Sequence, residues 1–215
     1  MSELIQFDKN NKTKSFLIGT DEAGRGPAAG SVFAAAVCFV NEPSGLLDSL
    51  NDSKKLTEKK REELYDVIIE NSVYSICEST VFQIEKMNIL NASLDAMKRA
   101  CEDVINQLAS SDVEVFVDGN KFIKNFSYQQ KYLIKGDSKS ASIAAASILA
   151  KVTRDRVMKD LDKEFPQYCW ASNKGYLSKT HIEAIKKYGI TEHHRKLFVR
   201  KILQDNESAT QLKLV

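Results

Sequence analysis

The chain has 215 residues, the length of one domain or of one domain with a small appendage. Its charged fraction of 28% and its hydrophobic fraction of 43% are those of an ordinary globular protein. No apolar run approaches the roughly 18 residues of a transmembrane helix, and the acidic N-terminus lacks the basic and apolar stretches of a signal peptide. We therefore expect a cytoplasmic location without membrane association, and a protein that acts as a monomer.

The net charge of +2 is the sum of stretches with opposite balances. Residues 1–118 contain 12 Lys and Arg against 20 Asp and Glu, whereas residues 119–202 contain 18 against 7. A basic excess in the second half indicates a polyanionic partner.

None of the four cysteines lies in a C-x-x-C pair or at another zinc spacing, which favours reduced cysteines in a core.

Hydrophobic periodicity and turn residues predict an α/β domain with a mixed sheet flanked by helices and a helical C-terminal part. In chain order we expect strands at 15–21 and 31–40, a helix at 57–71 capped by Thr57, a strand at 73–82, a helix at 90–108, strands at 113–118 and 131–134, and helices at 140–165, 178–188 and 192–204. The many alanines of 34–36 and 141–150 predict a close approach between the first strands and the long helix.

Four acids stand where these elements end. Asp21 and Glu22 follow the first strand, Asp118 ends the most apolar strand, and Asp137 precedes the Ser-rich start of the long helix. If the first and fourth strands pair, Asp21 and Asp118 are neighbours at one sheet edge. Clustered carboxylates repel one another unless a divalent cation neutralises them, and oxygen ligands favour Mg²⁺ or Mn²⁺.

Each acid also has a purely structural explanation. Asp118 can shape the turn at Gly119, Asp137 can cap a helix, and Glu22 can be solvated. The occurrence of all four acids together favours the metal site. The adjoining glycine-rich turn, residues 24–30, would let the backbone approach an anion or a ribose hydroxyl, although an ordinary tight turn has the same composition.

These residues belong to a series that resembles type 2 ribonuclease H (ribonuclease HII). The series follows the family order over roughly residues 16–200, nearly the whole chain. Its members are Gly19-Thr20-Asp21-Glu22-Ala23-Gly24-Arg25-Gly26-Pro27, Asn51-Asp52-Ser53-Lys54-Lys55-Leu56, Val117-Asp118-Gly119-Asn120, Lys135-Gly136-Asp137-Ser138, residues 144–155, Lys174-Gly175-Tyr176 and His193-His194-Arg195. The Arg of Gly-Arg-Gly favours the type 2 enzymes over the related type 3 enzymes.

The resemblance implies an endonuclease with the ribonuclease H fold. It would cut the RNA strand of RNA–DNA hybrids and incise 5′ of ribonucleotides embedded in duplex DNA, leaving 3′-hydroxyl and 5′-phosphate ends. The family's catalytic, metal-binding acids fall on Asp21, Glu22, Asp118 and Asp137, with two Mg²⁺ or Mn²⁺ ions about 3.5–4 Å apart. We expect Asp21 to be the bridging ligand.

The resemblance also assigns substrate contacts. Gly24, Arg25 and Gly26 would read the ribose 2′-OH, and Tyr176 would stack on the sugar at the RNA–DNA junction. Phosphate contacts would come from Lys54 and Lys55, and further contacts are expected from Lys151, Arg154, His194 and Arg195. The alternative for the lysines and Arg154 is a solvated surface position, and for the His-Arg pair it is a metal cluster or a capping role.

The chain departs from the family pattern near the substrate. Ala28 and Ser31 replace a Leu and a Pro, Asn173 replaces a His, and Leu177 replaces a Pro, but no metal ligand is lost. The implied organisation is an N-terminal extension at 1–15, a ribonuclease H-like catalytic core at 16–165, a helical substrate-binding part at 166–203 and a polar tail at 204–215. In that tail, residues 211–215 resemble the bacterial sliding-clamp-binding pattern Gln-Leu-x-Leu-Phe with Val for Phe; a disordered or packed tail is the alternative.

Two other functions compete with a metal-dependent ribonuclease. A non-catalytic nucleic-acid-binding module would keep the basic face, but a binder of polyanions gains nothing from clustered acids. A Mg²⁺-dependent phosphoryl-transfer enzyme acting on small nucleotides would keep the acids, but the basic excess of residues 119–202 favours a long polyanion.

Overall fold

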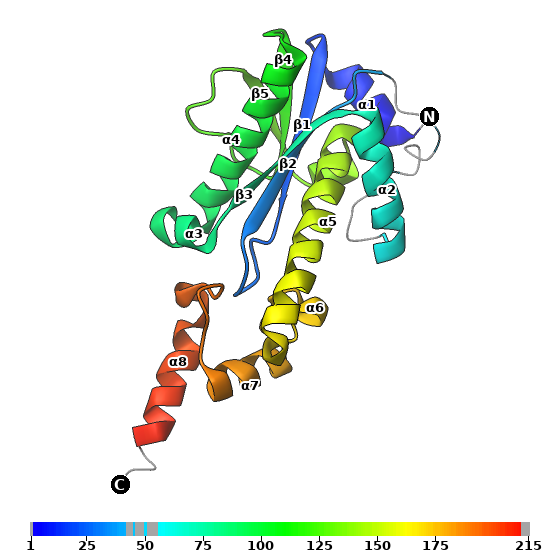
Figure 1. The fold of residues 1–215 in the computed structure, drawn as a ribbon. Coiled ribbons are helices and arrows are strands. Elements are labelled where there is room, and N and C mark those ends of the chain that lie inside the picture. The colour runs from blue at the N-terminus through cyan, green and yellow to red at the C-terminus, as the bar shows by residue number, and fades with distance from the viewer. Residues whose placement is uncertain (1, 42–44, 46–49, 51–55, 212–215) are drawn as a thin grey trace.

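The computed structural model of the chain describes residues 2–41, 45, 50 and 56–211 (Figure 1). Lys54 and Lys55, and the last four residues of the clamp-like tail, lie outside the described residues. The elements are α1 (Glu3–Asn11), β1 (Phe16–Ala23), β2 (Val32–Cys38), α2 (Glu58–Asn71), β3 (Val73–Ser79), α3 (Val81–Met87), α4 (Ile89–Leu108), β4 (Val113–Asp118), β5 (Gln129–Leu133), the 3₁₀ helix η2 (Gly136–Ser138), α5 (Ala141–Glu164), the 3₁₀ helix η3 (Pro166–Tyr168), α6 (Trp170–Asn173), α7 (Lys179–Tyr188) and α8 (Lys196–Gln211).

The strands form one mixed sheet in the order β3-β2-β1-β4-β5. The central strand β1 runs antiparallel to β2 and parallel to β4, and its register pairs Thr20 with Val117. The next residue on each strand is an acid, Asp21 or Asp118, so both acids lie at the same end of the β1–β4 ladder, while Asp21 still pairs with Ala35 of β2 and Asp118 with Leu133 of β5. The first and fourth strands do pair, which was the condition for Asp21 and Asp118 to be neighbours.

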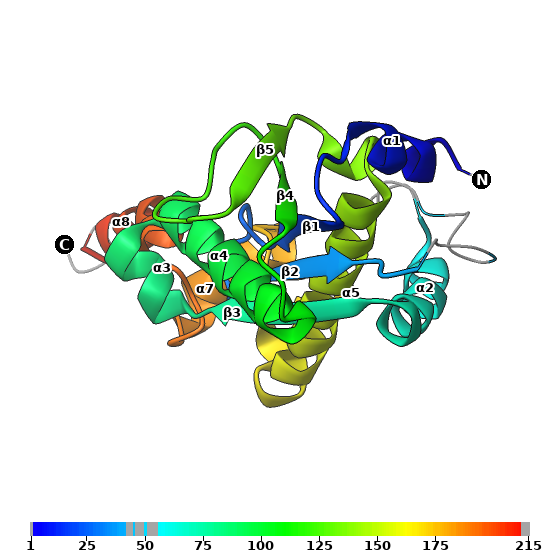
Figure 2. The same ribbon diagram turned by 90° about the horizontal axis from the view of Figure 1, so that it is seen from above.

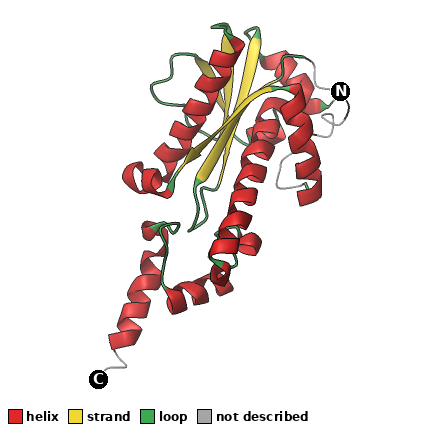
Figure 3. Ribbon diagram, in the orientation of Figure 1, coloured by secondary structure: helices red, strands yellow, loops and turns green. Residues whose placement is uncertain are grey.

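Helices cover both faces of this sheet, as the predicted α/β class requires (Figure 3). The helix α4 lies on one face, and α5 with α2 lies on the other. The shorter helices α6, α7 and α8 gather at the far end of α5, where Tyr168, Trp170 and Val199 pack around Met158 of that helix (Figure 1). Within the described part of the chain, none of the helices combines the length and the hydrophobicity needed to span a bilayer.

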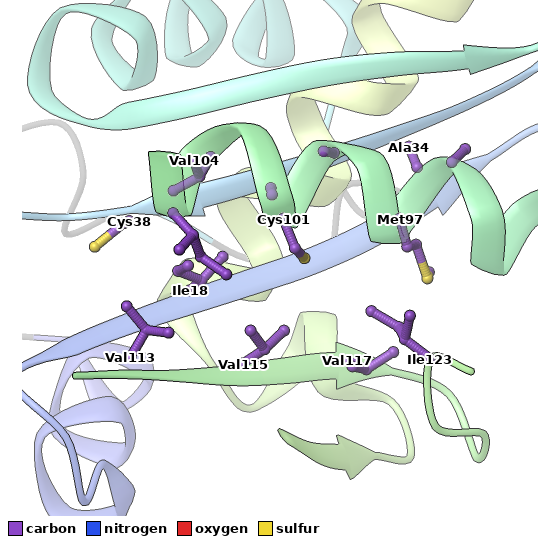
Figure 4. Close-up of a cluster of buried hydrophobic side chains, with 14 of the residues drawn as sticks. Ile18, Ala34, Cys38, Met97, Cys101, Val104, Val113, Val115, Val117 and Ile123 are labelled. Carbon is purple, nitrogen blue, oxygen red and sulfur yellow. The ribbon is translucent and has the colours of Figure 1, made fainter. Parts of the chain in front are cut away.

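The face under α4 is closed by an apolar stripe with helical spacing (Figure 4). Met97, Cys101 and Val104 point from α4 toward Ile18 of β1 and toward the valines of β4 (Figure 4). This arrangement confirms the amphipathic helix predicted for 90–108. It buries the parallel pair β1–β4 from one side and so fixes the two strands that carry Asp21 and Asp118.

The long helix α5 approaches β1 very closely on the other face. A Cβ atom built on Gly19 would lie 2.2 Å from the carbonyl carbon of Ser142, so only glycine fits there. Alanines 144–146 and 150 of α5 are also fully buried. The close helix–sheet contact expected from the small side chains is confirmed, and it brings one side of α5 directly beneath the acids.

Three α-helices of the structure, namely α1, α3 and the short α6, were not predicted from the sequence. The predicted strand at 73–82 ends at Ser79, because Thr80 and Gln83 form a capping box that starts α3. Within the supposed extension, α1 is capped by Ser2 and lies over the beginning of α5 (Figure 2). There its Asp8 accepts hydrogen bonds from the backbone N–H and the hydroxyl of Ser142. The last helix, α8, begins at 196 rather than at 192.

The four cysteines are all free thiols, as expected. Cys38 and Cys101 lie in the core beneath α4, and burial raises the pKa of the Cys101 thiol to about 12. Cys77 is only partly buried and Cys169 is exposed, so the expectation that the cysteines are core residues is correct for two of the four.

Candidate active site

A cleft of about 710 Å³ opens where β1 and β4 end. Three of the four predicted acids line it, together with the glycine turn, Tyr176 and Lys151. The complete lining is Asp21, Glu22, Ala23, Gly24, Arg25, Gly26, Ile89, Asp118, Ser147, Lys151, Arg154, Tyr176 and Phe198. Residues from the first strand, the fourth strand, the long helix and the C-terminal part thus share one concave surface.

Asp21 is the most buried of the acids in this cleft, with 5% of its surface exposed. Its Oδ1 accepts a hydrogen bond from the backbone N–H of Glu22 at 2.7 Å. Burial, reinforced by the charges of Glu22 and Asp118, raises the pKa of Asp21 well above its ordinary value, and a hydrogen bond from Ser147 only partly opposes this. A positive charge placed nearby would therefore favour the carboxylate form of Asp21.

Glu22 has a partial counter-ion. The Arg25 guanidinium lies 3.1 Å from its Oε1. Burial still raises the pKa of Glu22; the charge of Arg25 opposes this and that of Asp118 adds to it. The alternative of a merely solvated Glu22 is therefore wrong, because its side chain is 11% exposed and lies near two other acids.

Asp118 and Asp137 are connected through the backbone. Oδ1 of Asp118 accepts a hydrogen bond of 2.7 Å from the N–H of Gly136, the residue before Asp137. Asp137 itself is 6% exposed and is not among the residues that line the cleft. It is also not the N-cap of α5, because that position is occupied by Ser140, whose hydroxyl accepts from the N–H of Ile143. The capping alternative for Asp137 is therefore wrong.

The donor set fits a hard divalent cation. It consists of carboxylate oxygens, and the pKa values of Asp21 and Glu22 are raised in part by the negative charge that a cation would neutralise. Among the residues that the structure describes, no three His, Cys, Asp or Glu side chains converge into a ready-made metal cluster. The carboxylates are thus assembled around one cleft but are not drawn together into a coordination sphere.

The glycine turn and Tyr176 meet at the rim of the cleft. Gly24 has φ of +104°, which disfavours any side chain there. A Cβ atom on Gly26 would lie only 3.2 Å from Cε1 of Tyr176. The ring therefore packs closely against the turn, and a side chain at position 26 would crowd it. The ring remains 53% exposed and offers a flat apolar surface beside the acids.

The model of the ribonuclease HII family matches residues 18–202 of this chain. The chain belongs to the ribonuclease HII family. It is similar to the ribonuclease HII of Fusobacterium nucleatum, with 55% identity over 196 residues that cover 91% of each chain. The crystal structure of the Pyrococcus horikoshii ribonuclease H2 aligns with a TM-score of 0.72 and 27% identity, covering 89% of this chain and 99% of that one.

A further structural relative is the ribonuclease HII of Archaeoglobus fulgidus, solved in a complex with PCNA. It aligns with a TM-score of 0.66 and 25% identity, covering 84% of this chain and 93% of that one. The predicted ribonuclease H-like fold is therefore confirmed. As a ribonuclease HII, the protein is a hydrolase, an endonuclease that cleaves the RNA strand of RNA–DNA hybrids.

Three of the side chains expected to contact phosphates are almost completely buried in this ribonuclease HII, which argues against that role for them. Arg154, His194 and Arg195 are 2%, 1% and 0% exposed. Both guanidinium groups donate to main-chain carbonyls. Arg154 and Lys151 both line the cleft, but only Lys151 keeps part of its side chain exposed, and its Nζ also lies 2.6 Å from Asp155.

His194 belongs to a buried hydrogen-bonded chain of the C-terminal part. Its Nδ1 accepts from the N–H of Thr191, so its proton lies on Nε2, which donates to Nε2 of His181 at 3.1 Å. The same His181 nitrogen accepts from Trp170 Nε1, and its Nδ1 donates to the carbonyl of Tyr176 at 2.9 Å. Both imidazoles are neutral donors and acceptors, so the alternative of a metal cluster is also wrong.

One site residue was missed by the sequence-based reasoning. Ser147 of α5 hydrogen-bonds to Asp21 from the opposite layer of the fold. The sequence did contain an indication of this role, because Ser147 is a polar residue inside an Ala-rich helical run, one turn before Lys151. A hydroxyl there has no reason to be buried unless a polar partner faces it.

Proposed function

We propose that this ribonuclease HII, in addition to cleaving RNA–DNA hybrids, incises on the 5′ side of single ribonucleotides embedded in duplex DNA, leaving 3′-hydroxyl and 5′-phosphate ends. The observation that carries the proposal is the contact of the Tyr176 ring with the turn at Gly26, at the rim of the carboxylate cleft. This pair forms a narrow sensor for one sugar, directly beside the acids that act on its phosphate.

The pair formed by Tyr176 and the glycine turn suits recognition of the 2′-OH, the group that distinguishes RNA from DNA. Backbone groups of Gly24, Arg25 and Gly26 are accessible because the two glycines have no side chain to cover them. The exposed Tyr176 ring can stack on the sugar and so press its 2′-OH against the turn. A deoxyribose has no hydroxyl to complete these contacts.

We assign the metal site to Asp21, Glu22, Asp118 and Asp137, with Asp21 as the bridging ligand and Mg²⁺ or Mn²⁺ as the ions. Two such ions would lower the pKa of the attacking water and stabilise the departing 3′-oxygen. The protein supports this chemistry by holding Asp21 with Ser147 and Asp118 with the N–H of Gly136. Asp137 follows Gly136 directly and would join the site by a small movement of η2.

The duplex would extend over the basic second half of the chain. The helical part at 166–203 carries Tyr176 and would form one wall of the binding surface, and Lys151 would meet the phosphates at the cleft. Lys54 and Lys55 remain proposed phosphate contacts. Replacing both by Ala should weaken binding of an uncleavable hybrid and flatten the salt dependence of that binding, whereas an unchanged slope would remove them from the interface.

The tail at 211–215 is proposed as a sliding-clamp contact. The support is its resemblance to a clamp-binding pattern and the crystal structure of the Archaeoglobus fulgidus relative with PCNA. Deleting residues 211–215 should abolish binding to a purified bacterial clamp and leave hydrolysis unchanged. A deletion that keeps clamp binding would contradict this assignment.

The central experiment uses three duplexes of one sequence: all DNA, DNA with one ribonucleotide, and an RNA–DNA hybrid. With Mg²⁺ or Mn²⁺, the wild type should cut the second at the 5′ side of the ribonucleotide and leave the first intact. Asp118→Asn should lose activity on both substrates, and Tyr176→Ala should lose mainly the single-ribonucleotide activity. Cleavage of the hybrid alone by the wild type would overturn the proposal, and full activity of Asp118→Asn would overturn the metal site.

A further inference from the structure

The glycine turn is supported from inside the protein by a buried cation. Arg195 is completely buried, and its guanidinium donates to the carbonyl oxygens of Gly24 at 2.7 Å, Arg25 at 3.2 Å and Pro27 at 2.7 Å. It also donates to the carbonyl of Gly30, at 2.9 Å from Nε and 2.6 Å from Nη2. All five donor contacts of this side chain therefore end on the main chain of residues 24–30.

A second buried guanidinium continues the same arrangement. Arg154 of α5 donates to the carbonyls of Ser31 at 3.2 Å and Ala29 at 3.1 Å. Its Nη1 donates to the carbonyl of Lys174 at 3.0 Å, two residues before Tyr176. The backbone of Gly175 adds to this link, because its carbonyl accepts from the N–H groups of residues 28 and 29. The turn and the Tyr176 segment are thus tied together from below.

The orientation of these carbonyls determines where the amides of the turn point. In a trans peptide the C=O of one residue and the N–H of the next point in opposite directions. The carbonyls of Gly24 and Arg25 face the Arg195 guanidinium, so the N–H groups of Arg25 and Gly26 face away from it. Neither N–H has an acceptor among the described residues, and both residues line the cleft.

Burying the guanidinium groups of Arg154 and Arg195 close to each other is energetically unfavourable, because both lose their hydration and their charges repel. Within the described residues, the hydrogen bonds of both guanidinium groups go to main-chain carbonyls and not to a carboxylate. Burial, with the charge of Arg154 adding to it, lowers the pKa of Arg195 to about 9. A neutral side chain could fill the same space. What only a planar guanidinium provides is a fan of donors that orients several carbonyls at once.

We propose that Arg195 and Arg154 are positioning residues for ribonucleotide recognition. They draw the carbonyls of residues 24–31 inward, which presents the N–H groups of Arg25 and Gly26 to the ribose hydroxyl and holds them in register with Tyr176. The inference rests on the proposed function, in which the turn reads the 2′-OH. It adds the physical reason why that turn has outward-facing donors, and it assigns the role to two residues whose guanidinium groups are bonded to main-chain carbonyls.

The test compares Arg195→Lys and Arg154→Lys with the wild type. Lysine keeps the charge but presents its donors from a single point, so it cannot reach all of the carbonyls. Arg156→Lys is the matched control, since Arg156 lies on the same helix but is exposed and pairs with Glu62. Binding is measured without divalent metal, to an all-DNA duplex and to the same duplex with one ribonucleotide, and the readout is the ratio of the two affinities.

The wild type and the Arg156 control should share one affinity ratio, and both positioning variants should lower it roughly tenfold, as expected from the loss of one or two oriented hydrogen bonds. Their affinity for the all-DNA duplex should not change, which separates mispositioning from a loss of folded protein. An unchanged ratio in folded Arg195→Lys would overturn the inference. A wild type without any preference for the ribonucleotide would instead overturn the proposed function.

If Arg195→Lys does not fold, Gly24→Ala provides a second test, because it changes the turn and leaves both arginines in place. The added methyl would lie 2.2 Å from Nε of Arg154 and would displace the turn while both cations remain. The inference predicts the same fall in the affinity ratio, with the all-DNA affinity retained. A Gly24→Ala protein that still distinguishes the two duplexes would overturn it.

Discussion

Acid should destabilise this protein through His194, a buried residue of the C-terminal part. Burial and the neighbouring His181 lower the pKa of His194 to about 4, against about 6.5 for an unfolded histidine. Protonation would place a hydrogen on Nδ1, where the N–H of Thr191 already donates. Between pH 6.5 and pH 4 the unfolded chain therefore binds a proton that the folded chain excludes, and stability is lost as the pH falls through this range.

The size of the effect follows from the shift. About 2.5 pH units at roughly 1.4 kcal/mol each correspond to about 3 kcal/mol of unfolding free energy lost between pH 7 and pH 4. His194→Gln removes the titrating group but keeps a donor directed toward His181. Urea denaturation of both proteins at several pH values isolates the contribution, because all other groups titrate in both.

The wild type should lose about 3 kcal/mol more than His194→Gln over this range. The variant is expected to be less stable at pH 7, and that offset does not enter the comparison. Parallel pH profiles for the two proteins would refute the reasoning, because they would show that the imidazole does not stay neutral in the fold.

Three further outcomes follow from the same structure. Gly19→Ala should cost about 3 kcal/mol in thermal unfolding, because the methyl would lie 2.2 Å from the backbone of Ser142; an unchanged melting temperature would mean that α5 can move away from β1. Thr80→Ala should cost about 1 kcal/mol in chemical denaturation by removing the cap of α3, and a cost near zero would contradict the capping box. Mn²⁺ binding, followed by calorimetry, should weaken as the pH is lowered, since the raised pKa of Asp21 means that a proton competes with the ion; pH-independent binding would exclude Asp21 as a ligand.

The parts of the fold that depend on local sequence were predictable. Thr57 caps α2 at the expected position, and the apolar stripe of α4 gave its length to within one residue. The meeting of Asp21 and Asp118 followed from strand ends that share a sheet edge. The strand that overran Ser79 was an avoidable error, because the Thr80 and Gln83 spacing of a capping box was present in the sequence.

The inward orientation of the charged C-terminal residues was not predictable. Arginine and histidine are usually exposed, and nothing beside Arg195 in the sequence indicates burial. Its partners are carbonyls up to 171 residues away, which any sequence provides and no side-chain pattern marks. The basic excess of residues 119–202 was therefore interpreted too simply: part of that charge organises the protein's own backbone instead of facing a polyanion.

The distance in sequence between Gly30 and Arg195 affects the order in which parts of the enzyme can fold during synthesis. These residues are 165 positions apart, and the turn leaves the ribosome long before the guanidinium that orients it. By the time β5 is complete at residue 133, all strands of the sheet and the acids on β1 and β4 have been synthesised. If the proposed roles hold, the nascent chain acquires the acids on β1 and β4 early and the support of the glycine turn last, when Arg195 enters the folded structure.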